Sequence, residues 1–144
     1  MTRVDFYVLT GGDIDEKERL GCKLIEKAYR LGHRVYVLTP DADAARRMDD
    51  LLWVHQAGSF VPHALSGDTK QGDMPVLIGH LPPPAGYDDV LLSLAPDVPE
   101  CFSRFARVAE LVACDDADKA RSRARFKFYK ERGYPLHTHN LAPG

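Results

Sequence analysis

The residues with the clearest chemical potential form a basic run near the end of the chain. Positions 119 to 132 contain one acid, Glu131, and seven basic residues: Lys119, Arg121, Arg123, Arg125, Lys127, Lys130 and Arg132. Charges on a helix usually form a solvated face, but such faces tend to mix signs and gain i,i+4 pairs. Here Lys119, Arg123 and Lys127 follow one another at i,i+4 spacing, where like charges repel by a few tenths of a kcal/mol. A bound anion would relieve that repulsion, so the run indicates a binding site rather than a catalytic one.

Helical geometry adds an apolar component to this predicted site. At about 100° per residue, five side chains fall within about 100° of one another: Lys119, Arg123, Phe126, Lys127 and Lys130. A separate arc holds Ala117, Ala120, Ala124 and Phe128. Arginine grips a carboxylate through two parallel hydrogen bonds, lysine acts as a point charge, and a phenyl ring offers a flat apolar surface. The pattern favours an acidic ligand with an apolar end, and it leaves Arg121, Arg125 and Arg132 for solvent or structure.

A glycine turn after the first apolar segment suggests a second chemistry, nucleotide binding. Thr10-Gly11-Gly12-Asp13 stands where a Rossmann fold places its phosphate loop. Neither G-x-G-x-x-G nor G-x-x-x-x-G-K-[ST] is present, and Asp13, Asp15 and Glu16 would repel a phosphate. A simple turn between a strand and a helix is the favoured interpretation.

No other residues predict catalysis. His137 and His139 would share one side of an extended segment, but no carboxylate or cysteine stands nearby at ligand spacing. No serine or cysteine lies in a nucleophile motif such as G-x-S-x-G. We therefore expect no catalytic residue, no metal site and no cofactor.

One apolar stretch contains the only tryptophan of the chain. Leu51-Leu52-Trp53 is followed by Phe60-Val61-Pro62, on a segment whose proline favours a loop or an edge strand. Packing in the core and exposure as an aromatic anchor for another protein are both open interpretations.

Length and charge limit the class of protein. At 144 residues with 44% hydrophobic composition, the chain predicts a single soluble domain over residues 1–144. The formal charge is −2, and the 119–132 segment carries +6, seven basic residues less one acid, so the remainder carries −8. This asymmetry argues against broad nucleic-acid binding and favours a local acidic partner.

The three cysteines and the hydropathy indicate a compartment. Cys22, Cys101 and Cys114 are widely spaced, so neither a disulfide framework nor a zinc site is predicted. There is no apolar run of about 18 residues, and no signal-peptide pattern at the N-terminus. We expect a cytoplasmic protein without membrane contact.

The elements that must position these residues alternate between strands and helices. The pattern predicts a strand at 4–9, a helix closed by Gly32, a strand at 35–38 and a helix capped by Asp41. Two successive βα units imply a parallel sheet. Short strands follow at 76–79 and 90–94, among loops rich in glycine and proline.

The last third predicts the helix that carries the basic run. Pro99 opens a short helix, and Val108 to Ala113 either continues it or forms a last strand. Asp115 and Asp116 predict the cap of a helix at about 116–132, which Gly133 ends. Residues 134–144 are predicted to be a polar tail.

Three stretches together carry a family resemblance: Phe6-Tyr7-Val8-Leu9, then Leu52-Trp53 with Ser59-Phe60-Val61-Pro62-His63-Ala64-Leu65, then Ala124-Arg125-Phe126-Lys127-Phe128-Tyr129-Lys130 with Gly133-Tyr134. They resemble the chi subunit family of bacterial DNA polymerase III, nearly end to end, and S-F-V-P-H after a tryptophan is the most specific part. The resemblance implies a single-domain, Rossmann-like three-layer α/β/α sandwich with a mainly parallel central sheet. It also implies a non-catalytic accessory subunit of the clamp loader.

The resemblance also implies two partners. In that family the C-terminal helix binds the acidic, Phe-terminated tail of single-stranded DNA-binding protein, and the matching positions are Lys119, Arg123, Phe126 and Lys127, with Val112 lining an apolar pocket. Helical geometry adds Lys130 to this set. Phe126 replaces a tyrosine of the family, which keeps the stacking surface and removes a hydroxyl. The psi subunit of the clamp loader would bind the aromatic patch, which maps onto Trp53, Phe60, Val61 and Pro62.

Two functions are therefore in competition. The first is an adaptor that tethers the replication machinery to protein-coated single-stranded DNA. The alternative is a small Rossmann-like nucleotide-binding or hydrolytic enzyme, suggested by the βα units and the Gly11-Gly12 turn. Direct and specific binding of nucleic acid is not expected, because aromatic side chains for stacking several bases are lacking outside Phe126 and Tyr129.

Overall fold

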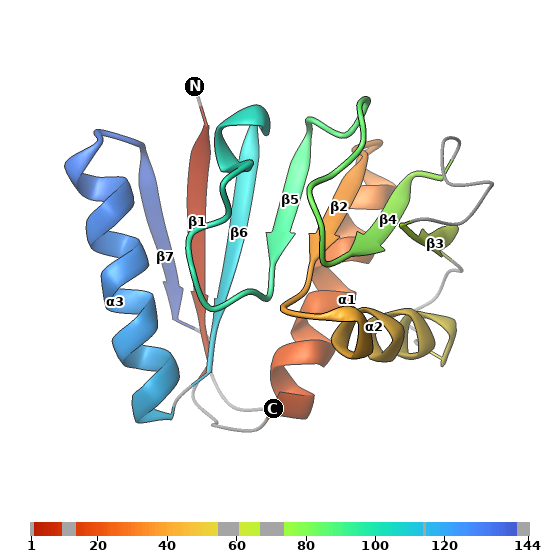
Figure 1. Cartoon of the computed structure of the whole chain (residues 1–144), viewed down its shortest axis with the longest axis horizontal. Helices are drawn as coiled ribbons and strands as arrows, with labels where there is room; N and C mark the ends of the chain where they lie inside the picture. Colours follow the sequence, from red (N-terminus) through yellow and green to blue (C-terminus); the bar gives the residue numbers. More distant parts are fainter. Residues whose placement is uncertain (1, 10–13, 55–60, 67–73, 114, 141–144) are drawn as a thin grey trace.

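A computed structural model describes residues 2–9, 14–54, 61–66, 74–113 and 115–140 of the chain. The elements in chain order are β1 (Arg3–Val8), α1 (Ile14–Arg30), β2 (Val35–Leu38), α2 (Ala42–Val54), β3 (His63–Leu65), β4 (Val76–Gly79), β5 (Val90–Ser93), the 3₁₀ turn η2 (Phe102–Arg104), β6 (Arg107–Val112), α3 (Asp116–Glu131) and β7 (Leu136–Asn140). Figure 1 shows them as one sheet flanked by helices.

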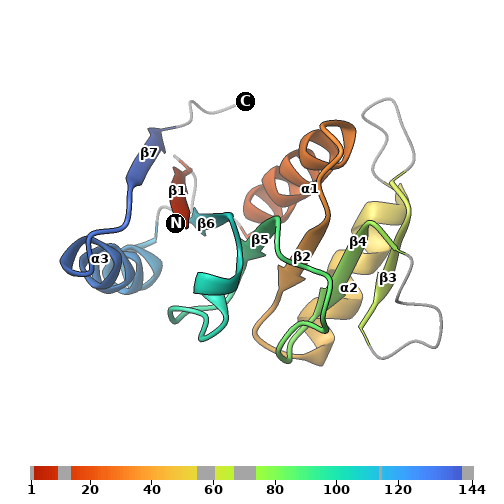
Figure 2. The same ribbon diagram turned by 90° about the horizontal axis from the view of Figure 1, so that it is seen from above.

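Within the described residues the sheet has seven strands in the order β3-β4-β2-β5-β6-β1-β7, and each of these strand pairings is parallel. Helices cover both faces, as parallel sheets require, and Figure 2 shows α1 and α3 on opposite sides of the sheet. The predicted fold class, a Rossmann-like α/β/α sandwich with a mainly parallel sheet, is confirmed.

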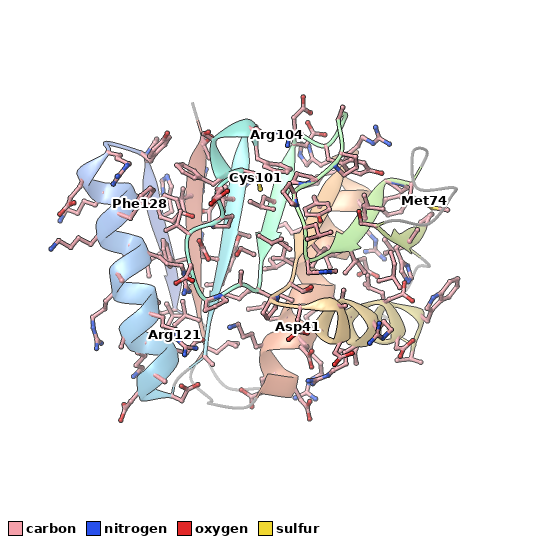
Figure 3. All side chains as sticks on the ribbon, viewed as in Figure 1. Asp41, Met74, Cys101, Arg104, Arg121 and Phe128 are labelled. Atoms are coloured by element: carbon pink, nitrogen blue, oxygen red, sulfur yellow. The ribbon has the colours of Figure 1, made fainter. Side chains whose placement is uncertain are left out.

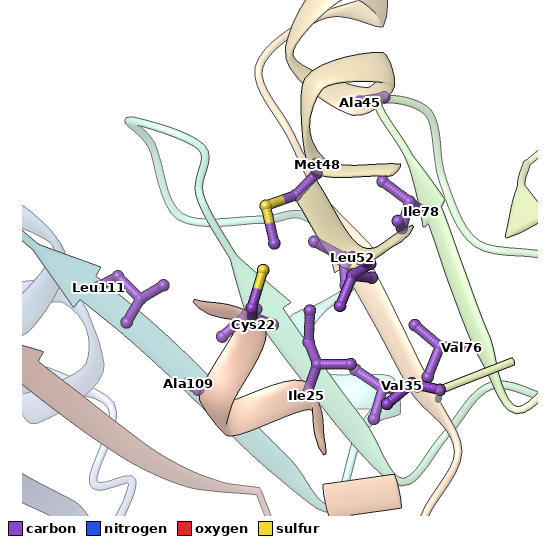
Figure 4. Close-up of a cluster of buried hydrophobic side chains, with 13 residues drawn as sticks. Cys22, Ile25, Val35, Ala45, Met48, Leu52, Val76, Ile78, Ala109 and Leu111 are labelled. Atoms are coloured by element: carbon purple, nitrogen blue, oxygen red, sulfur yellow. The ribbon is translucent and has the colours of Figure 1, made fainter. Parts of the chain in front are cut away.

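One half of the core lies between α1, α2 and the sheet. Cys22 and Ile25 of α1 pack with Met48 and Leu52 of α2 onto alternate residues of the central strands, among them Val35 (Figure 4). The other half lies beneath α3, where Phe6, Val108 and Tyr129 share a cluster with Phe102. Period-two alternation along β1 and β6 sends their side chains into these two separate layers.

The helix ends follow the predicted signals. Asp41 accepts a hydrogen bond from the backbone N–H of Ala44 at 2.8 Å, which caps α2. Gly32, at φ +86°, closes α1 in the left-handed conformation that glycine tolerates best. Of the two possibilities left open for 108–113, the strand is correct, because β6 spans Arg107–Val112.

One prediction differs from the structure, and one exposed leucine departs from the apolar pattern of its helix. Residues 136–140 were predicted as part of a polar tail, but they form β7, paired along β1 with Leu136 opposite Val4 and His139 opposite Tyr7. An edge strand needs few apolar residues, so its sequence resembles a tail. Leu31 fits the apolar periodicity of α1, yet it is 65% exposed.

Candidate functional site

The helix α3 carries the predicted cationic site and is fixed at its start by aspartates. Asp115 accepts a hydrogen bond from the backbone N–H of Asp118 at 2.9 Å, as the sequence predicted for the N-cap. Asp118 in turn accepts from the N–H of Ala113 at 2.7 Å and from Lys17 of α1 at 3.2 Å. These contacts join the start of α3 to the end of β6 and to α1.

The buried side of α3 is polar as well as aromatic. Arg125 is 2% exposed, its Nε lies 3.2 Å from Oε1 of Glu110 on β6, and its Nη1 donates to the carbonyl of Pro96 at 2.6 Å. The hydroxyl of Tyr129 donates to the other Glu110 oxygen at 2.7 Å. Burial raises the pKa of Glu110 to about 7, although Arg125 and Tyr129 lower it. Arg125 is therefore a structural residue that orients the helix.

The solvent side of α3 presents what we call the cationic row: Lys119, Arg123, Lys127 and Lys130. Lys119 is half-buried and the other three are exposed. Lys127 lies 3.8 Å from Glu131 in an exposed i,i+4 pair, which contributes little because water screens it. Within the part of the chain that the structure describes, Lys119, Arg123 and Lys130 form no ion pair. The row keeps its capacity for an external anion.

Phe126 stands at the border between the cationic row and the core. It is half-buried, with its ring centroid 5.4 Å from that of Phe6 on β1. Val112, the last residue of β6, is 2% exposed and belongs to the cluster against which Phe126 packs. An exposed cationic row beside a partly exposed ring supported by an apolar cluster can hold a carboxylate and an apolar group together.

Phe128 was placed on a separate arc with three alanines, and the structure shows what that arc does. The alanines Ala117, Ala120 and Ala124 are exposed. Phe128 packs edge-on against Phe102 at 5.8 Å, and the guanidinium of Arg132 lies 3.6 Å from its ring centroid. In Figure 3 Phe128 lies toward one end of α3 and the exposed Arg121 toward the other.

The second predicted surface is divided between solvent and core. Trp53 is 57% exposed near the end of α2, and the neighbouring Val54 is 67% exposed. Val61 is only 2% exposed and belongs to the core, while Pro62 is half-buried. Phe60 lies outside the described residues. Core packing is thus correct for Val61, while Trp53 is exposed.

The buried His63 packs against the ring of the exposed Trp53. It is 5% exposed, and its ring centroid lies 4.8 Å from that of Trp53. Its ring nitrogens lie 2.7 Å from the carbonyl oxygen of Val61 and 3.2 Å from that of Asp49. The histidine joins β3 to α2 and so fixes where Trp53 stands.

Sequence reasoning missed Glu110 and Tyr129, which orient α3. The available signal was a single glutamate inside the apolar run Val108 to Ala113, together with Arg125 and Tyr129 at i,i+4 spacing. A buried carboxylate needs partners, and that helix pair was the nearest candidate.

The described residues give no structural support for nucleotide binding or metal binding. The Thr10 to Asp13 turn lies outside the described residues. Among the residues that the structure does describe, no group of three or more His, Cys, Asp or Glu side chains could hold a metal ion. None of the helices in that part of the chain has the length and hydropathy needed to span a membrane.

Comparison with known proteins identifies the family. Residues 1–137 match the family described as DNA polymerase III chi subunit, HolC. A DNA polymerase III subunit chi from Pseudomonas aeruginosa is 38% identical over 98% of this chain and 98% of its own length. Those from Escherichia coli and Haemophilus influenzae are 32% and 31% identical, over 96% and 94% of this chain and 97% and 95% of their own lengths. The chain therefore belongs to the DNA polymerase III chi subunit family.

Proposed function

We propose that the protein is a non-catalytic accessory subunit of the DNA polymerase III clamp-loader complex that binds the acidic C-terminal tail of single-stranded DNA-binding protein. The observation that carries the proposal is the cationic row beside Phe126, because three of its four cations have no ion-pair partner among the described residues. In a folded protein such a row is retained at the cost of mutual repulsion. Membership of the chi family supports this assignment.

The binding mechanism follows from the chemistry of the row. The acidic tail is attracted by the cations of α3, and its terminal carboxylate pairs with the guanidinium of Arg123 or with a lysine ammonium. Its terminal aromatic ring packs on Phe126, with the apolar cluster around Val112 behind that ring.

The affinity of one tail is modest. A few residues of flexible tail bury much less surface than a standard interface and lose entropy on ordering. We expect a dissociation constant of roughly 1 µM, or about −8 kcal/mol. Many tails on one DNA strand raise the effective affinity, so that weak single contacts still tether the polymerase to coated DNA.

We propose further that the aromatic patch around Trp53 binds the psi subunit where that partner exists. The support is the exposure of Trp53 and Val54, two of the four large hydrophobic side chains exposed in the described structure. An exposed tryptophan held by a packed histidine is a typical anchor of a protein interface. Val61 is buried in the core next to this patch and supports it by packing, without being exposed to the partner.

A reciprocal binding experiment tests both surfaces. Calorimetric titration of an acidic, Phe-ended peptide with a free carboxylate should give an affinity about tenfold weaker for Arg123→Ala than for wild type, because one charge-assisted pair is lost. Arg121→Ala, an exposed cation of the same helix outside the row, is the matched control. Trp53→Ala should weaken binding of purified psi subunit and leave the peptide affinity unchanged.

The outcomes separate the two assignments. Equal peptide affinity for wild type and Arg123→Ala would refute tail binding at α3. If Arg121→Ala lost as much affinity as Arg123→Ala, the binding would be non-specific charge attraction to the helix. Unchanged psi binding by Trp53→Ala would refute the second surface alone.

A further inference from the structure

Among the residues that the structure describes, the face of the sheet opposite α3 is open at the edge formed by β7 and β1. On β7 and β1 the residues that point away from α3 include His137, His139, Asp5 and Tyr7, all of them polar. On β6 Arg107 is exposed on this side, whereas Ala109 and Leu111 are buried in the cluster that α1 covers. The nearest helix on that side, α1, lies over the middle of the sheet (Figure 2). His137 and Arg107 are exposed, and Tyr7 is half-buried. Parallel sheets are normally covered on both faces, so this open region needs explanation.

A groove runs between this open face and the C-terminal half of α1. Its apolar lining includes Leu24 and Ala28 of α1, Leu31 just after that helix, and Tyr7 and Ala109 of the sheet. The cavity volume is about 70 Å³, the space of about five water molecules, which suits one large side chain and not a whole ligand. Leu31 at its rim is 65% exposed. A partner that covers this leucine and the apolar groove beside it would gain free energy from the buried apolar surface.

The charges around the groove are of one sign. The side chains with ionisable nitrogen that line it are Lys27, His33 and Arg107, and no carboxylate is among the lining residues. Asp5, the acid that pairs with Arg107, is fully buried: Arg107 Nε donates to it at 2.8 Å, Arg3 Nη2 donates at 3.0 Å, and the His139 ring lies at 2.9 Å. Lys27, Arg3 and Arg107 against one carboxylate leave a net charge of +2 with the histidines neutral.

We propose that this α1 groove is a second docking site, for an acidic segment of a partner protein that inserts one large apolar side chain. The apolar floor takes that side chain, while Lys27 and Arg107 pair with carboxylates on either side of it. The site lies on the opposite face of the sheet from the cationic row, so it does not depend on the function proposed for α3.

Two other occupants fit less well. A second copy of the chain would bring Lys27 and Arg107 of one groove toward those of the other, which costs free energy by like-charge repulsion. A free small molecule would be mostly exposed in a space of about 70 Å³, whereas small-molecule sites bury most of the ligand. A peptide gains further contacts along the open sheet face.

The test uses the full chain and a defined probe. The probe is an amidated acidic hexapeptide with one central leucine, which lacks the terminal carboxylate and ring proposed for the α3 ligand. Two-dimensional NMR titration should shift the backbone amides of Leu24, Ala28, Leu31 and Ala109, with a dissociation constant of about 0.1–1 mM. The same peptide with serine in place of leucine should bind at least about fivefold more weakly.

Paired variants locate the contact. Leu31→Asp should weaken binding of the peptide at least about fivefold. Leu81→Asp, which alters a leucine of similar exposure outside the groove, should leave the affinity unchanged. Lys27→Glu should weaken it, and Lys23→Glu, one turn earlier on α1 and outside the lining, should have a smaller effect. Both members of each pair change the net charge equally.

The proposal is overturned by any of three results: no amide shifts at about 5 mM peptide, shifts confined to α3, or equal effects of Leu31→Asp and Leu81→Asp. Sedimentation analysis supplies a fourth, since self-association that Leu31→Asp abolishes would make a second copy the occupant.

Discussion

At the residue scale, the orientation of α3 depends on a buried carboxylate. Glu110 is fully buried, and it meets Arg125 and the hydroxyl of Tyr129. A buried charge pair costs desolvation free energy that its Coulomb attraction only partly repays. What the network supplies is a fixed rotation of the helix, since no other rotation places both partners against Glu110. That rotation turns the cationic row outward.

Glu110 also predicts a pH dependence of stability. Its pKa is about 7 in the folded protein, because of burial, against 4.5 for an ordinary glutamate. Between these values the folded state binds more protons than the unfolded state, so the free energy of unfolding should fall as pH rises from about 4.5 to about 7, by at most about 3 kcal/mol. Above that range this contribution is constant.

Urea unfolding across this pH range, followed by circular dichroism, checks the prediction. The comparison is with Glu110→Gln, which keeps the size of the side chain and an oxygen acceptor for Tyr129 but does not titrate. The variant should have the flatter profile, and histidine titration is common to both proteins. Parallel profiles would show that Glu110 does not change its protonation in this range.

At the element scale, β7 shows how a strand can form from residues that predict none. Leu136–Asn140 has the sequence LHTHN, and three of its five residues are exposed. It is held by its pairing with β1 and by His139, whose ring stacks on Tyr7 at 4.6 Å and contacts Asp5. Hydrogen bonds from His139, Arg107 and Arg3 outweigh the effect of burial and lower the pKa of Asp5.

His139→Ala should therefore weaken the attachment of β7. The lost contact with a buried, charged acceptor corresponds to about 1–2 kcal/mol of unfolding free energy. Denaturant unfolding measures this, and hydrogen exchange of the β7 amides should speed up. His137→Ala, at an exposed position on the same side of β7, should change stability by less than about 0.5 kcal/mol and serves as the control. Equal effects of the two would contradict the role given to His139.

Local patterns predicted most of the helices and strands, and they predicted part of which α3 side chains face solvent. The strand at Val35–Leu38 and the helix behind Asp115 follow from apolar runs and capping residues, which are local signals. The outward direction of Arg123 follows from helical periodicity. The burial of Arg125 does not, because it is decided by a glutamate fifteen positions earlier in the chain that only the folded sheet brings opposite it. For the same reason the periodicity of α1 could not show that Leu31 lacks a strand to cover it.

At the scale of the whole molecule, the surfaces proposed on α3 and around Trp53 lie at opposite edges of the sheet. The helix α3 stands beside β7 at one edge, and α2 with Trp53 packs near β3 at the other. A peptide on one surface therefore leaves the other accessible. The geometry suits a connector that holds both partners at once.

Charge distribution over the whole chain predicts a strong effect of salt on tail binding. The 119–132 segment carries +6, seven basic residues less one acid, and the rest carries −8. An acidic tail is therefore attracted to α3, whereas the rest of the chain carries a net negative charge. Raising salt from about 0.05 to about 0.5 M shortens the screening length to about 4 Å, and the affinity should fall about tenfold.

The same titration with the tail's acidic residues replaced by serine provides the control. That peptide keeps the terminal carboxylate and ring, so its weaker binding should respond much less to salt. Equal salt dependence for the two peptides would mean that the acidic residues of the tail do not interact with α3.

The position of β1 in the sheet has a consequence for how the protein is made. Its two neighbours are β6 and β7, with Arg3 opposite Arg107 and Val4 opposite Leu136. The ribosome therefore releases β1 long before its neighbours β6 and β7 exist. The edge of β5 that pairs with β6 also stays unpaired until β6 has been synthesised. Contacts so distant in sequence form slowly, and an unpaired strand invites aggregation. β1 is thus synthesised before both of its neighbours, and the sheet is complete only after β7 has been translated.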